Sequence, residues 1–178
     1  DTWIRKADMP TVRCDFSTSL VNGKIYAIGG VSWRGLNQSA LATVEAYDPS
    51  TDTWTRKHDM PEATCWHSAS VVDRKIYVIG NGSRWSGTQP NRASTVWEYD
   101  PATDAWTPRG NMPTVRGAHS ASVVNWRIYT IGGAGDIGNV TYATVEVYDP
   151  ATDTWTTGAN MPTPRGLLAV SALGGKIY

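Results

Sequence analysis

Hydrophobic residues along this chain come in short runs, and each run is bounded by glycine, proline, asparagine or aspartate. Residues 24–28, with the sequence Lys-Ile-Tyr-Ala-Ile, place apolar or aromatic groups on both faces of an extended strand. That pattern is typical of a strand that is covered on both sides. Since no stretch keeps a 3.6-residue apolar spacing long enough to predict a helix, the pattern indicates an all-β protein.

The hydrophobic runs group into units of four expected strands. In the second unit these strands are residues 68–72, 75–79, 95–99 and 105–107. An Asp-Pro pair followed by Thr-Asp marks a turn between the last two strands of a unit. Alternation of apolar and polar positions is weak in these strands, so we expect the sheets to stack face to face.

The units form a repeat of close to 50 residues. Tryptophan recurs at intervals of 51, 52 and 49 residues, with an aspartate two positions before each. A Met-Pro pair begins six residues after each tryptophan, and an Ile-Tyr pair begins sixteen residues after each methionine. The recurring tryptophans are Trp3, Trp54, Trp106 and Trp155, and a Tyr-Asp-Pro word ends at Pro49, Pro101 and Pro150. Groups repeated in every unit are interpreted as structural.

These words resemble the kelch-repeat family, whose period is about 50 residues, and the resemblance covers essentially the whole chain. It implies kelch-type β-propeller blades, each of four antiparallel strands, in a partial propeller. Two positions depart from the repeat: Asn81 stands where other units have a second glycine, and Thr64 stands where they have arginine.

We expect a single kelch propeller segment over residues 1–178. Its blades are expected at approximately 13–57, 64–108 and 116–157, with a partial blade at 165–178 completed by an outer strand at 1–6. The chain then holds about 3.75 blades, whereas kelch propellers usually have about five to seven. The resemblance therefore implies that the rest of a longer chain, or a second copy, closes the propeller.

Charge and hydropathy exclude two classes of partner. Lys plus Arg is 16 and Asp plus Glu is 16, so no net charge attracts nucleic acid or an anionic membrane. The apolar runs fall far short of the roughly 20 residues that span a bilayer. Neither nucleic acid binding nor membrane insertion is expected.

Nothing in the sequence predicts a metal or another cofactor. His67 and His119 occupy a slot that holds Phe16 and Leu168 in the other repeats, so its expected role is apolar packing, and His58 has no partner at ligand spacing. Two cysteines lie in equivalent repeat positions, Cys14 and Cys65. They are interpreted as free thiols, with a bridge between blades as the alternative.

An arginine slot follows the Met-Pro pair in three of the four repeats, at Arg13, Arg116 and Arg165. The slot leads into the inner strand of each blade, close to the propeller axis. Guanidinium groups there could bind a carboxylate or an acidic peptide, and kelch substrate adaptors of ubiquitin ligases use basic and polar residues in this region. The alternative is that each arginine bonds loop carbonyls or a neighbouring glutamate.

All variation in repeat length falls between the second and third strands of a blade, in residues 29–43, 80–95 and 132–144. In an up-and-down sheet these loops emerge on the side that carries the arginine slot, and variable loops on a rigid scaffold commonly bind ligands. The remaining ligand-binding candidates on or beside these loops are Asp15, Trp33, Arg34, Trp66, Arg84, Trp85, Arg92 and Asp136. Tryptophan and arginine are typical of interface hot spots, although Trp33 and Trp85 could instead cap their own blades.

Three classes of function follow. The favoured one is a non-catalytic scaffold that binds a protein, peptide or glycan through the loop side, because no triad, metal set or close carboxylate pair is apparent. The resemblance leaves open a carbohydrate-processing enzyme of the sialic acid mutarotase-like kelch type, with Glu62 or Asp15 as acid or base. Three scattered histidines do not support the copper ligands of a galactose oxidase-like site.

The third class is a structural spacer in a multidomain surface protein. The composition, rich in Thr, Ser and Trp and poor in Lys, resembles that of secreted kelch proteins. An extracellular or cell-surface location is therefore expected, with the cytoplasm as the alternative.

Overall fold

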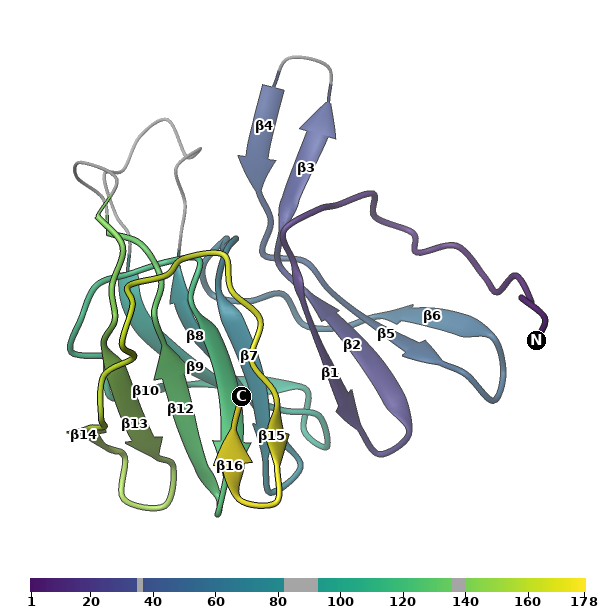
Figure 1. Ribbon diagram of the computed structural model, residues 1–178. Coiled ribbons are helices and arrows are strands. Elements are labelled where there is room, and N and C mark those ends of the chain that lie inside the picture. The colour runs from purple at the N-terminus through teal and green to yellow at the C-terminus, as the bar shows by residue number, and fades with distance from the viewer. Residues whose placement is uncertain (35–36, 82–92, 136–139) are drawn as a thin grey trace.

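A computed structural model describes residues 1–34, 37–81, 93–135 and 140–178. In these ranges all regular secondary structure is β-strand, as the sequence predicts (Figure 1). Three four-stranded antiparallel sheets follow one another along the chain, and a short hairpin comes after the third. Within the same ranges, nothing helical has the length and apolarity that crossing a membrane requires.

The sheets keep the strand order of an up-and-down blade. The first contains β1 (Ser17–Val21), β2 (Lys24–Ile28), β5 (Val44–Asp48) and β6 (Thr53–Arg56). The second contains β7 (Ser68–Val72), β8 (Lys75–Asn81), β9 (Ala93–Asp100) and β10 (Ala105–Arg109). The third contains β11 (Ser120–Val124), β12 (Arg127–Ile131), β13 (Val145–Asp149) and β14 (Thr154–Thr157), and the last hairpin pairs β15 (Ala172–Leu173) with β16 (Lys176–Ile177).

An additional hairpin projects from the first sheet, between its second and third strands (Figure 1). It consists of β3 (Val31–Arg34) and β4 (Asn37–Ala40), which pair antiparallel. The sequence predicts only a loop of variable length here, so this hairpin is a feature that the repeat pattern does not reveal.

The hydrophobic core lies between successive sheets. Ile28 and Val44 of the first sheet pack with Ile76 and Val78 of the second in one buried cluster. A second cluster joins the second sheet to the third, and includes Ile79, Val96, Ile128 and Tyr148. Because each inner sheet is covered on two faces, its strands need apolar groups on both, which explains the weak alternation in the sequence.

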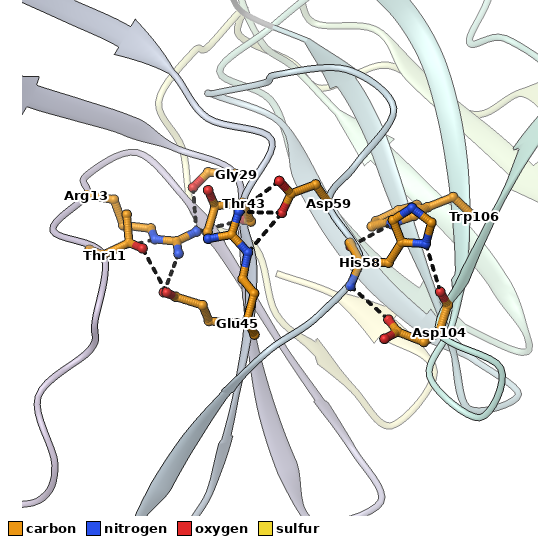
Figure 2. Close-up of polar contacts among 10 residues, drawn as sticks. Thr11, Arg13, Gly29, Thr43, Glu45, His58, Asp59, Asp104 and Trp106 are labelled. Atoms are coloured by element: carbon orange, nitrogen blue, oxygen red, sulfur yellow. Dashed lines mark hydrogen bonds and ion pairs between the residues drawn. The ribbon is translucent and has the colours of Figure 1, made fainter.

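The repeated Asp, Trp and Tyr words hold each blade to the connection that precedes it. Asp104 Oδ1 accepts hydrogen bonds from the Tyr99 hydroxyl, at 2.5 Å, and from the His58 backbone N–H, at 3.0 Å. Trp106 Nε1 donates to the His58 carbonyl at 3.1 Å (Figure 2). Equivalent bonds join Tyr47, Asp52 and Trp54 to Ala7, and Tyr148, Asp153 and Trp155 to Gly110. These words are therefore structural, as interpreted from their recurrence.

The outer strand expected at residues 1–6 is not formed. These residues have no strand structure, and Trp3 is fully exposed. A strand depends on a neighbour for its backbone hydrogen bonds, and no described strand lies beside this segment to supply them. Residues 1–6 thus form no strand within this chain, and their role as the outer strand of a closed propeller stays a prediction.

Candidate functional site

Two sets of connecting segments lie together on one side of the sheets. One set follows the second strand of each blade, and the other leads into the inner strand. The backbones of Cys14 and Val31 exchange hydrogen bonds of 3.0 and 2.8 Å, and those of Gly117 and Ala134 exchange bonds of 3.1 and 2.8 Å. The β3–β4 hairpin rises from this side (Figure 1). We call this side the loop face, and the side that carries the β1–β2, β7–β8 and β11–β12 turns the hairpin face.

Four residues at equivalent repeat positions form a row across the loop face: Asp15, Trp66, Ala118 and Leu167. Each backbone N–H donates to the preceding carbonyl of the row, from Trp66 to Asp15 at 3.3 Å, from Ala118 to Trp66 at 2.9 Å and from Leu167 to Ala118 at 2.8 Å. All four have a φ of 53° or 54°, a left-handed conformation that is uncommon outside glycine. We call these residues the axial row; its backbone is constant, whereas its side chains differ completely.

A cavity of about 270 Å³ opens at the axial row. Each blade contributes two consecutive residues to its lining, namely Asp15 and Phe16, Trp66 and His67, Ala118 and His119, and Leu167 and Leu168. Asp15 is exposed and Trp66 is half-buried. The cavity therefore offers one carboxylate, one indole and two buried imidazoles beside the apolar groups of Phe16, Ala118, Leu167 and Leu168.

Trp33 stands next to this cavity. It lies on β3 with 59% of its surface exposed, and its Nε1 donates to Cys14 Sγ at 2.9 Å. The same sulfur lies 3.7 Å from Asp15 Oδ2. Of the ligand-binding residues suggested by the sequence, the structure thus brings together Asp15, Trp33 and Trp66.

Arg13 does not face a ligand. It is 8% exposed, and its Nη1 donates to the carbonyls of Gly29 and Thr43 at 3.0 and 2.8 Å. Its Nη2 forms an ion pair with Glu45, which also accepts a hydrogen bond from Thr11 (Figure 2). Burial lowers the pKa of Arg13, and Glu45 opposes that change.

Arg116 repeats this arrangement in the third blade and is completely buried. Its guanidinium donates to the Thr144 carbonyl at 2.9 Å, to Thr130 Oγ1 at 2.8 Å and to Glu146 Oε2 at 2.9 Å. Both guanidinium groups thus bond carbonyls and a glutamate of their own blades, which is the alternative that the sequence leaves open for this slot. Arg165, in the same slot of the last repeat, is exposed.

The second blade replaces this buried unit as a whole. Where the third blade has Thr114, Arg116 and Glu146, the second has Glu62, Thr64 and Trp97. The Thr95 hydroxyl reaches Glu62 at 3.5 Å, and Thr64 Oγ1 reaches the Gly80 carbonyl at 3.5 Å. The sequence shows Thr64 as a departure, but the matching change from Glu to Trp on the third strand is recognised only once the partners of the arginine are known.

Arg84, Trp85, Arg92 and Asp136 lie outside the described residues, and so does the side chain of Arg34, which ends β3. Of the acid–base candidates for sugar chemistry, Asp15 lines the cavity and Glu62 does not. Among the described residues, neither Arg13 nor Arg116 forms an ion pair with Asp15.

His67 and His119 are buried between blades rather than arranged as metal ligands. Ser17 Oγ lies 2.7 Å from His67 Nε2, and Ser68 Oγ lies 2.9 Å from His119 Nε2, so each ring joins one blade to the inner strand of the blade before it. Within the described ranges no group of three possible metal ligands is found. The cysteines Cys14 and Cys65 are free thiols.

These histidines should make stability fall in mild acid. Burial lowers the pKa of His67 to about 4, and burial with the Arg116 charge lowers that of His119 to about 3. In the unfolded chain both titrate near 6.5, so stability is complete above that pH and falls as the pH drops towards 4, by on the order of 3 kcal/mol per histidine. Urea denaturation at a series of pH values between 7 and 4 measures the loss.

The matched control is the double variant His67→Phe with His119→Leu, which uses the residues that the chain itself has in this slot, Phe16 and Leu168. Its midpoint should change much less with pH over the same window. An equal pH dependence in the variant and in the wild-type protein would assign the loss to other groups.

A larger cavity, of about 630 Å³, opens on the hairpin face between the second and third blades. Its cations are already paired: Lys75 and Arg109 both bind Glu98, and Arg127 Nε lies 3.3 Å from Asp149. Burial raises the pKa of Glu98, but hydrogen bonds from its three neighbours, Tyr77 among them, lower it overall. Because these charges neutralise one another, the smaller cavity on the loop face is the better candidate site.

The chain forms successive sheets of four antiparallel strands that pack face to face, with their inner strands adjacent and a loop face at one end. This arrangement defines a β-propeller segment. Residues 2–133 match the family described as the KLHDC2/KLHL20/DRC7 kelch-repeats domain, and residues 116–162 match the kelch motif. The chain belongs to the kelch-repeat family.

Curated relatives share about a third of the matched residues. Kelch-like protein 36 of Bos taurus is 34% identical over 134 residues, which is 75% of this chain and 21% of that protein. Alpha-scruin of Limulus polyphemus is 34% identical over 74% of this chain and 14% of its own length. Kelch-like protein terF of Aspergillus terreus is 35% identical over 74% of this chain and 30% of its own length. The chain thus spans well under half of these relatives.

Among solved structures, that of YjhT superposes with a TM-score of 0.78 at 19% sequence identity, over 93% of this chain and 57% of that one. At this identity the likeness establishes the fold alone. Together with the family match, it confirms the all-β kelch propeller expected from the repeated words.

Proposed function

We propose that this protein is a non-catalytic interaction scaffold that binds a protein partner through the loop face. The observation that carries the proposal is the group of Trp33, Asp15 and Trp66 around the axial-row cavity. Large exposed aromatic groups beside a cavity are typical of interface hot spots. Kinship with kelch-like proteins supports an interaction role.

The scaffold beneath this group is rigid. Hydrogen bonds link the axial row from blade to blade, and the buried pairs of Arg13 with Glu45 and Arg116 with Glu146 hold the segments that lead into it. A partner that contacts this surface therefore meets side chains with little conformational freedom left to lose, which favours affinity.

The variant Trp66→Ala should lower partner affinity about 30-fold or more, which corresponds to a loss of roughly 2 kcal/mol. Alanine is accepted by this backbone, because Ala118 occupies the equivalent position with a φ of 54°. Partners captured by the wild-type protein would be identified by mass spectrometry, and the affinity of the principal one measured by calorimetry with both proteins.

Trp126→Ala is the matched control. Trp126 is another tryptophan in the left-handed conformation, with a φ of 65°. It is more exposed than Trp66, at 73%, and lies on the hairpin face. The control should keep wild-type affinity. Equal losses in the two variants, or no loss in either, would refute binding through the loop face.

A further inference from the structure

We infer that the axial-row cavity receives a positively charged side chain, a lysine or an arginine of the partner, beside Trp66 and against the Asp15 carboxylate. This inference rests on the proposed function and names the chemistry of the group that is recognised. From the sequence, the arginine slot predicts an acidic ligand. The inferred ligand is basic instead.

The first argument is the state of the charges on the loop face. The arginines that would bind an acidic ligand, Arg13 and Arg116, are neutralised internally by Glu45 and Glu146. Asp15 is exposed, and no Lys, Arg or His of the described residues forms an ion pair with it. Among the described residues, the charge available in the lining of the cavity is therefore the negative one of Asp15.

The exposed Arg165 does not change this balance. It belongs to the last repeat, whereas Asp15 belongs to the first, at the opposite end of the axial row. A cation bound at Asp15 would therefore lie closer to the carboxylate than to that guanidinium. Electrostatic complementarity of this kind selects the partner more than it increases affinity.

The second argument is the aromatic surface around the carboxylate. Trp33 Nε1 and Asp15 Oδ2 both lie within 4 Å of the Cys14 sulfur, at 2.9 and 3.7 Å. On the other side, the Trp66 backbone N–H bonds the Asp15 carbonyl, and both side chains line the cavity. Indole is the aromatic group that attracts cations most strongly, and a carboxylate close to an indole combines ion pairing with cation–π attraction.

The size of the cavity also fits such a side chain. Its volume of about 270 Å³ can accept an extended lysine or arginine but lies below the range of about 300–1,000 Å³ typical of small-molecule sites. The apolar part of the lining, Phe16, Leu167 and Leu168, would contact the methylene groups of the stem while the charged end reaches Asp15.

The experiment uses three fluorescein-labelled peptides with one glycine–serine backbone and three central residues that are all arginine, all lysine or all glutamate. Their binding to the protein is followed by fluorescence anisotropy. We expect the arginine and lysine peptides to bind, the glutamate peptide to bind at least tenfold more weakly, and Asp15→Asn to weaken the cationic peptides about tenfold.

Asp73→Asn is the matched control, since Asp73 is an exposed aspartate with a φ of 47° at the β7–β8 turn of the hairpin face. It makes the same change of charge in the same backbone conformation, and asparagine tolerates that conformation. Asp73→Asn should leave all three affinities unchanged. Equal effects of the two substitutions, or tighter binding of the glutamate peptide, would overturn the inference.

Binding of the captured protein partner to the Trp66→Ala and Asp15→Asn variants distinguishes this inference from the proposed function. A partner that requires Trp66 but binds Asp15→Asn with wild-type affinity would leave the interaction scaffold in place and refute the cation. A partner that requires neither Trp66 nor Asp15 would refute both. Loss of the partner in both variants, with no loss in Asp73→Asn, would support both.

Discussion

The variant Arg116→Thr is expected to lower the free energy of unfolding by about 3–5 kcal/mol. Arg116 is completely buried, and its removal leaves the Glu146 carboxylate in a nearly water-free site with one remaining hydrogen bond, from Thr114. An unpaired buried charge is far more costly than the loss of a well-solvated ion pair. The midpoint of urea denaturation, compared with that of the wild-type protein, measures the effect.

The second blade supplies the control, because it has Thr64 and Trp97 in the corresponding slots. The double variant Arg116→Thr with Glu146→Trp removes both charges and introduces a pair that another blade already contains. It should be clearly more stable than Arg116→Thr alone. If both variants lose equal stability, the cost arises from packing and not from the unpaired carboxylate.

The second large effect is expected for Gly29→Ala, at about 3 kcal/mol. Gly29 has a φ of +62°, and a Cβ placed there would lie 2.7 Å from the Thr64 carbonyl and 2.9 Å from His67 Cε1. These atoms belong to the second blade, so the added methyl group would separate two blades besides straining the backbone. Thermal denaturation of the variant measures the loss.

Gly23→Ala isolates the contribution of the backbone conformation. Gly23 has a φ of +75° at the β1–β2 turn, and a Cβ placed there meets no atom within 4 Å. This variant should lose about 1 kcal/mol, the cost of a left-handed alanine. A loss as large as that of Gly29→Ala would contradict the steric explanation.

The second blade has other residues in place of the buried arginine–glutamate pair. This replacement suggests how a single blade can differ in sequence from its neighbours while the propeller fold is kept. Blades one and three each hold an arginine and a glutamate in an internal pair, whereas blade two has Glu62, Thr64 and Trp97 in the same slots. The stacking of the sheets is unaffected, because the interblade bonds of Asp104 and Trp106 are kept. Blade-specific residues can therefore change without disturbing the repeat.

The repeated words determined the fold class from the sequence alone. Each repeated motif makes the same hydrogen bonds in every blade. For example, Asp52, Asp104 and Asp153 each accept a bond from the hydroxyl of the tyrosine five residues before them. Because these hydrogen bonds join residues close together in the sequence, the residues recur at fixed spacing, and that spacing can be recognised without the structure. The position of the loop face follows from the same up-and-down order, and so does the expectation that Trp33 and Trp66 lie on it.

Only the tertiary structure decided which of the candidate residues are available. Arg13 is buried beside Glu45 of β5 and bonds the carbonyls of Gly29 and Thr43, which adjoin β2 and β5. Asp15 meets Trp66 because the axial row links consecutive blades. Residues 1–6 form no strand because no strand in the described part of the chain pairs with them. In each case the deciding partner lies on another strand or another blade, where a pattern along the chain carries no information about distance, solvent access or unpaired charge.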